Sequence, residues 1–245
     1  MGEGSHGAKR ARRGAGGPAD NEWTTPRERA RAAAALVDGW LSERQGAALF
    51  DAAARCSGRG AIVEIGSWKG RSTIWLASGA RLAGQRVVAV DPHVNSREDP
   101  AARTLDEFAE NIRRAGIEDA VTPLVMSSRD AARVVNGGVE LLFIDGDHSD
   151  TGAEQDADIW LPRLVEGGTV MMHDVITASY TGPRNVFRRR ICWGAAYADV
   201  RRVGSMGIAR RVARRSPIDA AWGAITGLLL YMLDVKRLLR RVSKS

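Results

Sequence analysis

Apolar and polar positions alternate along the chain in a pattern typical of strands followed by helices. The first complete unit is an apolar run at 61–65, a turn with two glycines at 66–70, and a helical apolar pattern at 71–82. The same alternation recurs four times, with apolar runs at 86–90, 121–126, 139–145 and 169–172. This succession predicts an α/β fold with a doubly wound, mostly parallel sheet and helices on both faces.

The remaining segments extend this framework at both ends. Helices are expected between the later strands, at 100–114, 128–135 and 149–165. Two more helices should precede the first strand, because Thr25 and Ser42 each open a capping box. Pro123 inside the third apolar run indicates a strand near an edge of the sheet. After the fifth strand, two short runs around Gly204 predict a hairpin, and 218–239 predicts a last helix.

Composition divides the chain of 245 residues into four stretches. They are a basic tail at 1–20, the first helices at 21–58, the core domain at 59–213 and a C-terminal helix at 214–245. The tail lacks the apolar segment of a secretion signal. The two cysteines, Cys56 and Cys192, have neither metal-ligand spacing nor a disulfide framework. Both features favour a cytoplasmic protein.

The formal net charge of +7 is unevenly distributed. Ten arginines and a single acid, Asp199, lie between Arg184 and Arg215. Such a stripe can attract nucleic acid, anionic lipid or an acidic substrate, or it can be an ordinary solvated face. The chain shows no RNA-binding module and no Asn/Asp-Pro-Pro-Tyr motif of base methylation, so nucleic acid is the less favoured partner.

Polar residues gather where the predicted strands end. In a doubly wound sheet, ligands bind beyond the carboxyl ends of the strands. The polar and small residues at these positions are Glu64, Gly66, Asp91, Ser127, Ser128, Asp145, Asp147, His148, His173 and Asp174. Several acids at one sheet edge exceed what turns alone require, so this edge is the candidate site.

Four motifs, in order, resemble those of class I S-adenosylmethionine-dependent methyltransferases. They are VEIGSWKGRST at 63–73, VVAVDPH at 87–93, LLFIDGDHS at 141–149 and WLPRLVEGGTVMMHD at 160–174. The likeness covers about residues 40–212 and is strongest to the small-molecule O-methyltransferase branch. It implies a seven-stranded sheet whose last strand is antiparallel, and a small-molecule hydroxyl as methyl acceptor.

The resemblance also implies which residues bind S-adenosylmethionine. The cofactor set is Glu64, Gly66, Ser67, Gly70, Ser72, Asp91, Ser127, Ser128 and Asp145. The glycine loop is expected under the methionine part, with Glu64 orienting its amino-acid end. Asp91 can accept both ribose hydroxyls, although an Asp-Pro turn needs no ligand. Ser127 and Ser128 are expected at the adenine. His93 either lines the adenosine pocket or is a solvated loop residue.

The acceptor side is expected at Asp145, His148, His173 and Asp174. A hydroxyl needs either a general base or a cation that stabilises its oxyanion. His148 and His173 are candidate bases beside Asp145. Alternatively, Asp145, Asp174 and His173 could hold Mg²⁺, although histidine suits this ion less well than oxygen ligands do.

The C-terminal segment combines an uncharged run at 220–233 with Lys236, Arg237, Arg240 and Arg241. This pattern indicates peripheral membrane contact through 218–241, with a homodimer helix or a helix packed on its own sheet as alternatives. The predicted function is therefore O-methylation of a small molecule, with Mg²⁺ assistance left open. An RNA methyltransferase using the arginine stripe, or a non-methylating protein on the same fold, are the alternatives.

Overall fold

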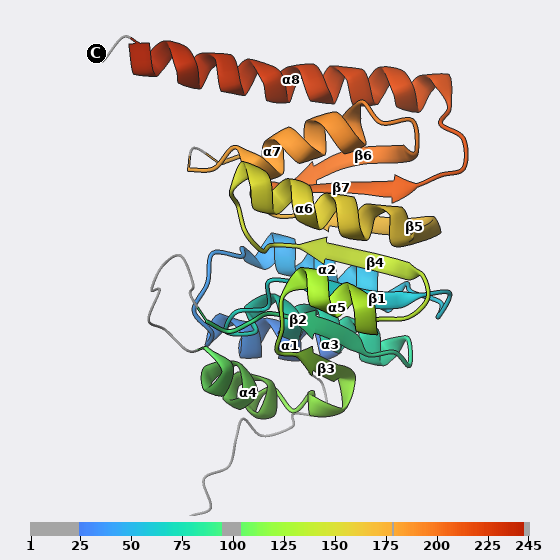
Figure 1. Ribbon diagram of the computed structural model, residues 1–245. Helices are drawn as coiled ribbons and strands as arrows, with labels where there is room; N and C mark the ends of the chain where they lie inside the picture. Colours follow the sequence, from blue (N-terminus) through green and yellow to red (C-terminus); the bar gives the residue numbers. More distant parts are fainter. Residues whose placement is uncertain (1–24, 95–103, 178, 243–245) are drawn as a thin grey trace, which may run out of the picture.

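The computed structural model describes residues 25–94, 104–177 and 179–242, and their strands form one seven-stranded sheet (Figure 1). The strands are β1 (Ala61–Ile65), β2 (Val87–Val90), β3 (Val121–Leu124), β4 (Val139–Ile144), β5 (Leu164–Met172), β6 (Tyr197–Val203) and β7 (Met206–Arg211). Their order is β3-β2-β1-β4-β5-β7-β6, with β1 to β5 parallel and β7 antiparallel to both β5 and β6. The predicted doubly wound sheet, the edge position of β3 and the closing hairpin are confirmed.

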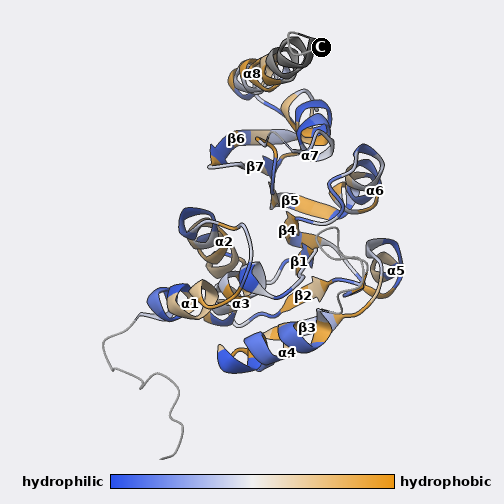
Figure 2. Ribbon diagram, turned by 90° about the vertical axis from the view of Figure 1, so that its left-hand side faces the viewer, coloured by the Kyte–Doolittle hydropathy of each residue, from blue (hydrophilic) through white to orange (hydrophobic). Residues whose placement is uncertain are grey.

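Helices cover both faces of the sheet (Figure 2). One layer consists of α1 (Pro26–Ala35), α2 (Glu43–Ala54), α3 (Arg71–Leu82) and α4 (Leu105–Arg114). The other consists of α5 (Ser128–Val134), α6 (Asp150–Trp160), α7 (Gly182–Val186) and the π-helical segment Phe187–Cys192. Neighbouring strand residues enter different layers, so Ile62 packs in the α3 layer and Val63 in the α6 layer. Every residue of β4 is buried, as a strand covered on both faces requires.

The first two helices form a packing layer against α3. Both predicted capping boxes are present, with Thr25 and Ser42 each accepting a backbone hydrogen bond at the N-cap. Gly79 of α3 lets α2 approach closely, because a Cβ there would overlap the carbonyl oxygen of Phe50. The loop between α1 and α2 is held at the start of α3 by Arg71, whose guanidinium donates to the carbonyls of Val37 and Leu41.

Three sequence expectations differ from the structure. The helix predicted at 149–165 ends at Trp160, because Pro162 cannot extend it and lies in a 3₁₀ turn, Leu161–Arg163. Strand β5 therefore begins at Leu164 rather than at Thr169. Helix α4 begins at Leu105 instead of at 100, and its expected first residues fall outside the described part of the chain. Elements α7 and the π-helical segment occupy a region with no predicted element.

The last helix, α8 (Pro217–Val242), lies across the outside of β6 and the π-helical segment (Figure 1). Among the described residues, no helix has both the length and the apolar character needed to cross a membrane. The basic tail at 1–20 lies outside the described residues. The domain divisions and the cytoplasmic location stay predictions.

Candidate active site

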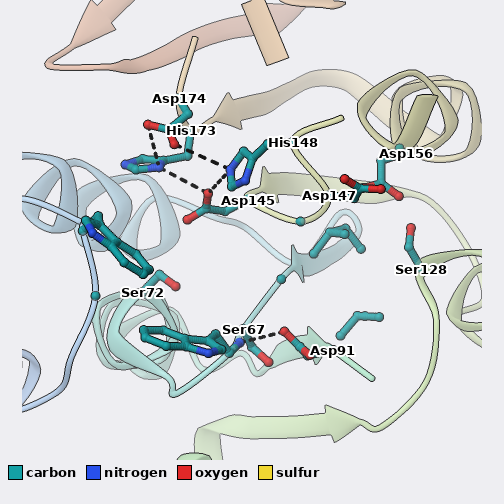
Figure 3. Close-up of a pocket in the computed structure, with 18 of the residues that line it drawn as sticks. Ser67, Ser72, Asp91, Ser128, Asp145, Asp147, His148, Asp156, His173 and Asp174 are labelled. Atoms are coloured by element: carbon teal, nitrogen blue, oxygen red, sulfur yellow. Dashed lines mark hydrogen bonds and ion pairs between the residues drawn. The ribbon is translucent and has the colours of Figure 1, made fainter. Parts of the chain in front are cut away.

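One cavity of about 680 Å³ opens at the carboxyl ends of the parallel strands (Figure 3). Its volume lies within the range of small-molecule and cofactor sites, roughly 300–1,000 Å³. Among the sequence-predicted site residues, its lining includes Gly66, Ser67, Ser72, Asp91, Ser127, Ser128, Asp145, His148, His173 and Asp174. Glu64, Gly70 and His93 do not line this cavity. The two predicted sides of the site therefore share one space.

The glycine loop after β1 is shaped by its own backbone and by neighbouring strands. Gly66 has φ +89°, and a Cβ there would overlap the backbone carbonyl of Asp145 after β4. Gly70 has φ +90° and is the N-cap of α3, packed against Phe108 and Ile112. Both glycines therefore adopt a backbone conformation that favours residues without a Cβ. Their small size serves contact with protein atoms.

Asp91 fastens this loop to the end of β2. Its Oδ2 accepts a hydrogen bond from the backbone N–H of Trp68 at 2.8 Å, and its Oδ1 accepts one from that of His93 at 2.7 Å. Both residues have left-handed backbones, with φ 42° and 54°, which side chains other than Gly, Asn and Asp rarely adopt. Each carboxylate oxygen keeps a second acceptor site, so Asp91 can stabilise the loop and still accept two ligand hydroxyls.

Glu64 lies behind the cavity wall rather than in it. Its fully buried carboxyl accepts hydrogen bonds from the Ser72 and Thr73 hydroxyls, both at 2.5 Å, and Ser72 is the residue that reaches the cavity. Burial raises the pKa of Glu64 to about 8, against the opposing effect of these two hydroxyls. Glu64 therefore lines no part of the cavity itself, and its predicted role in orienting the cofactor stays a prediction.

His93 also lies behind the wall. Its ring is buried beside Phe108, and its Nδ1 lies 3.0 Å from the Thr104 hydroxyl. Neither expected role, a pocket-lining ring or a solvated loop residue, describes it. Its contribution is structural, through the backbone N–H that Asp91 binds.

The acceptor side is a cluster of two carboxylates and two imidazoles (Figure 3). His148 Nε2 lies 3.1 Å from Asp145 Oδ1 and 3.7 Å from Asp174 Oδ2. His173 Nδ1 lies 3.2 Å from Asp145 Oδ1 and 3.5 Å from Asp174 Oδ1. Asp174 lies in the turn after β5 with φ 53°, a conformation that Asp tolerates better than most residues. The ring of Tyr180 stacks on His148 with centroids 4.6 Å apart.

These groups shift one another's protonation. Burial lowers the pKa of His148, but the hydrogen bond and charge of Asp145 and the charge of Asp174 outweigh it and raise the pKa overall. Burial likewise lowers the pKa of His173, and the hydrogen bond and charge of Asp145 with the charge of Asp174 outweigh it, so this pKa is also raised. Burial raises the pKa of Asp145, and hydrogen bonds from both histidines reverse this effect, so its pKa is lowered. Asp145 is thus held ionised between two basic imidazoles.

The opposite end of the cavity contains an acid that sequence reasoning missed. Asp156 is 4% exposed, lies beside Ser128, and has its pKa raised to about 6, chiefly by burial. The Ser128 hydroxyl also accepts a hydrogen bond from the indole N–H of Trp160 at 2.8 Å. Buried positions on α6 follow helical spacing at Ala153, Asp156 and Trp160. The sequence signal that could have identified Asp156 is the presence of an acid on the apolar face of this helix.

Two tryptophans form the wall beside the glycine loop. Trp40, from the loop between α1 and α2, stacks on Trp68 with ring centroids 5.3 Å apart and planes 24° apart. Both line the cavity, and Trp40 is 69% exposed. Only the fold brings these two residues together, because they belong to separate segments of the chain.

The predicted Mg²⁺ ligands Asp145, Asp174 and His173 do lie together, with the imidazole directed at the carboxylates. Asp145 Oδ1 is within 3.2 Å of an imidazole nitrogen from each histidine, which leaves it fewer free acceptor positions for a metal ion. Within the described residues, no group of three or more His, Cys, Asp or Glu side chains has an arrangement able to hold a metal ion.

Comparison with known proteins agrees with this architecture. Residues 63–175 match a family described as a methyltransferase domain. A catechol O-methyltransferase of Mycobacterium tuberculosis is 36% identical over 114 residues, which is 46% of each protein. The match thus spans about half the length of that curated relative.

Solved structures extend the likeness over more of the chain. Cofactor-bound Rv0187 from MTB has a TM-score of 0.56 and 25% identity, over 76% of this chain and 88% of the other. An O-methyltransferase from Bacillus cereus in complex with SAH has a TM-score of 0.56 and 24% identity, over 76% and 90%, and shows the shared fold. By this partial sequence match and by its fold, the chain is similar to S-adenosylmethionine-dependent methyltransferases.

Proposed function

We propose that the protein transfers a methyl group from S-adenosylmethionine to a hydroxyl of a small molecule, with His148 as general base. The observation that carries this proposal is the pairing of His148 with Asp145 in the same cavity as the glycine loop and Asp91. An imidazole whose proton affinity is raised by a carboxylate can accept a hydroxyl proton near neutral pH.

The cavity has the features that S-adenosylmethionine requires. The buried Ser67 hydroxyl has no partner within the described residues, and Asp91 retains acceptor capacity, so both can bind a polar ligand. Ser72 is available at the methionine end, and Ser127, Ser128 and Asp156 lie at the far end. There the Asp156 carboxylate can accept a hydrogen bond from the amine of adenine. When bound, the cofactor supplies a methyl group on a sulfonium.

His148 is the better placed of the two candidate bases. The Nε2 atom of His148 faces Asp145, so its other ring nitrogen is left to take the proton from the substrate hydroxyl. The His148 side chain is 20% exposed, so a substrate can reach it. The side chain of His173 is 5% exposed, and its Nε2 is enclosed without a partner in the described residues. We therefore assign His173 and Asp174 to orienting Asp145 and sustaining its charge. Tyr180, stacked on His148, restrains the ring.

A flat acceptor suits the opening of the cavity. Trp40 and Trp68 offer an aromatic wall, and Tyr180 lies on the side of the base. Aromatic faces favour stacked rings. A phenolic hydroxyl is also the easier hydroxyl to deprotonate, since its pKa is about 10. The similarity to a catechol O-methyltransferase supports the same acceptor class.

Mg²⁺ assistance is the second version of this mechanism. Asp145 and Asp174 would be the oxygen ligands, with His173 as a poorer third ligand. Metal binding would require Asp145 Oδ1 to give up at least one of its two imidazole contacts. The donor set therefore favours the metal-free base, and chelation decides between the two versions.

The arginine stripe does not favour an RNA substrate. Arg189 pairs with Glu154 at 3.1 Å, Arg210 pairs with Asp199 at 2.7 Å, and Arg190 pairs with Asp158. Arginines engaged in this way are less available to phosphates. We retain RNA methylation and a non-methylating role only as outcomes of the following test.

The test measures cofactor binding and methyl transfer separately. Calorimetry with S-adenosylmethionine should show one site per chain, and mass spectrometry should detect a methylated catechol used as probe. His148→Gln should keep the cofactor affinity and lower kcat by about 10²–10⁴-fold, the usual contribution of a general base. Unchanged kcat in His148→Gln would refute the assigned base. Activity lost with EDTA and restored by Mg²⁺ would establish the metal version instead.

A further inference from the structure

Helix α8 contacts the rest of the protein through its smallest residues. Within 217–233, the part of α8 whose burial is described, the buried positions are Gly223, Gly227 and Leu230. A Cβ at Gly223 would crowd the backbone carbonyl of Cys192, and one at Gly227 would overlap the ring of Trp193. The helix therefore docks closely along a narrow line of two glycines and one leucine.

Most of the large apolar side chains of α8 are exposed to solvent. Ile218, Trp222, Ile225, Leu228, Leu229, Tyr231, Met232 and Leu233 are each between 37% and 83% exposed. The helix is the outermost layer beyond β6, coloured largely as hydrophobic (Figure 2). A contiguous apolar surface of this kind on a folded protein marks an interaction site.

The breadth of this apolar face indicates its partner. At 100° per residue, the exposed apolar positions cover roughly 200° of the helix circumference. Two-helix pairing uses a narrower seam flanked by charged residues. Residues 220–233 carry no charge, so such flanks are missing over four turns. A continuous apolar medium matches this face better than a second copy of the helix does.

The basic residues that follow the apolar run indicate that the partner surface is anionic. Lys236, Arg237, Arg240 and Arg241 follow the apolar run within the same helix, whose two acids are Asp219 and Asp234. The chain as a whole carries a net charge of +7. Basic residues beside an apolar face are attracted to anionic lipid headgroups.

We propose that α8 lies flat on an anionic phospholipid bilayer, with its outward apolar face in the headgroup boundary. Trp222 is suited to such an interface because its indole N–H already donates to the Val200 carbonyl at 2.9 Å, leaving the ring apolar. The helix binds as a peripheral anchor, and the inference does not depend on the proposed methyl transfer.

The experiment is sedimentation of the full chain with vesicles of roughly two parts phosphatidylcholine to one part phosphatidylglycerol. The wild type should pellet with these vesicles at least about tenfold more strongly than with phosphatidylcholine alone, and salt should weaken it. Leu228→Gln combined with Leu229→Gln should lower partitioning by about tenfold or more. Lys236→Gln combined with Arg237→Gln should reduce binding only to the anionic vesicles.

A matched control separates this face from general surface hydrophobicity. Leu36→Gln with Leu82→Gln removes two comparably exposed leucines, at the C-terminal ends of α1 and α3, and should leave pelleting unchanged. All variants should keep the helical circular dichroism of the wild type. The proposal would be overturned if the Leu228→Gln, Leu229→Gln variant pelleted as strongly as the Leu36→Gln, Leu82→Gln control. It would also be overturned if the wild type did not pellet. A dimer in buffer that dissociates on Leu228→Gln with Leu229→Gln, while vesicles bind nothing, would overturn it as well.

Discussion

Glu64→Gln tests whether a buried acid beneath the cofactor loop is neutral. Protonated Glu64 can accept a hydrogen bond from one hydroxyl and donate to the other, of Ser72 and Thr73. A glutamine can do the same with its carbonyl and its amide, at nearly the same size. The substitution therefore mimics the protonated form and removes only the ability to ionise.

The magnitude follows from the difference between the folded and unfolded pKa values of this carboxyl. Its pKa rises from 4.5 to about 8, because burial disfavours the charge and Asp145 and Asp91 add repulsion. The unfolded chain releases the proton near pH 4.5 and the folded chain only near pH 8, so wild-type stability falls as pH rises between these values. At 1.36 kcal/mol per pH unit, the loss reaches about 3 kcal/mol at pH 7.

Denaturant unfolding across this pH range measures the effect. Glu64→Gln and wild type should be about equally stable near pH 4.5, and the variant should gain about 1 kcal/mol per pH unit up to about pH 8. Because Glu64 does not line the cavity, S-adenosylmethionine affinity should change by less than about threefold, or about 0.7 kcal/mol. A variant less stable than wild type at neutral pH, by a constant amount, would show that Glu64 is ionised. A large loss of affinity would show that it touches the cofactor.

Three further substitutions test other parts of the site. Asp174→Asn should lower the pKa of His148, because it removes a negative charge beside the ring. The fall of kcat/KM at acidic pH, which reflects protonation of His148, should then begin at lower pH. An unchanged pH profile would show that Asp174 does not influence His148. Gly66→Ala should destabilise the fold by about 2–4 kcal/mol in denaturant unfolding, because φ is +89° and the added Cβ meets Asp145, and a loss below 1 kcal/mol would contradict it. Asp156→Asn should weaken S-adenosylmethionine binding about tenfold above pH 6 and less below it, as measured by calorimetry at two pH values. An equal loss of affinity at both pH values would show that the charge of the carboxylate does not contribute to binding.

The strands and their polar ends could be predicted because burial on both faces leaves a continuous apolar run. β4 is the plainest case, since all six residues from Val139 to Ile144 are buried. The end of α6 could also have been found, because Pro162 cannot extend a helix. The segment of α7 and the π-helical turns has no comparable periodicity, and its structure depends on packing against α6 and α8.

The site was predictable as a set of residues and less so as a set of roles. Strand ends placed Asp91, Asp145 and Asp174 at one edge, and the fold brought them into one cavity. Sequence could not show that Glu64 faces α3 rather than the ligand, since that depends on which layer covers each side of β1. Nor could it pair Trp40 with Trp68, which come from separate segments.

The protonation states of Glu64, Asp145 and His148 depend on one another through charge. Asp145 raises the pKa of Glu64, so an ionised Glu64 would in turn work against the ionised form of Asp145. His148 owes its raised pKa to Asp145 staying ionised. Burying Glu64 until it is neutral at physiological pH therefore protects the basicity of His148, the residue proposed to accept the hydroxyl proton. On this reasoning Glu64, at the end of β1, also influences the electrostatics of the proposed acceptor side.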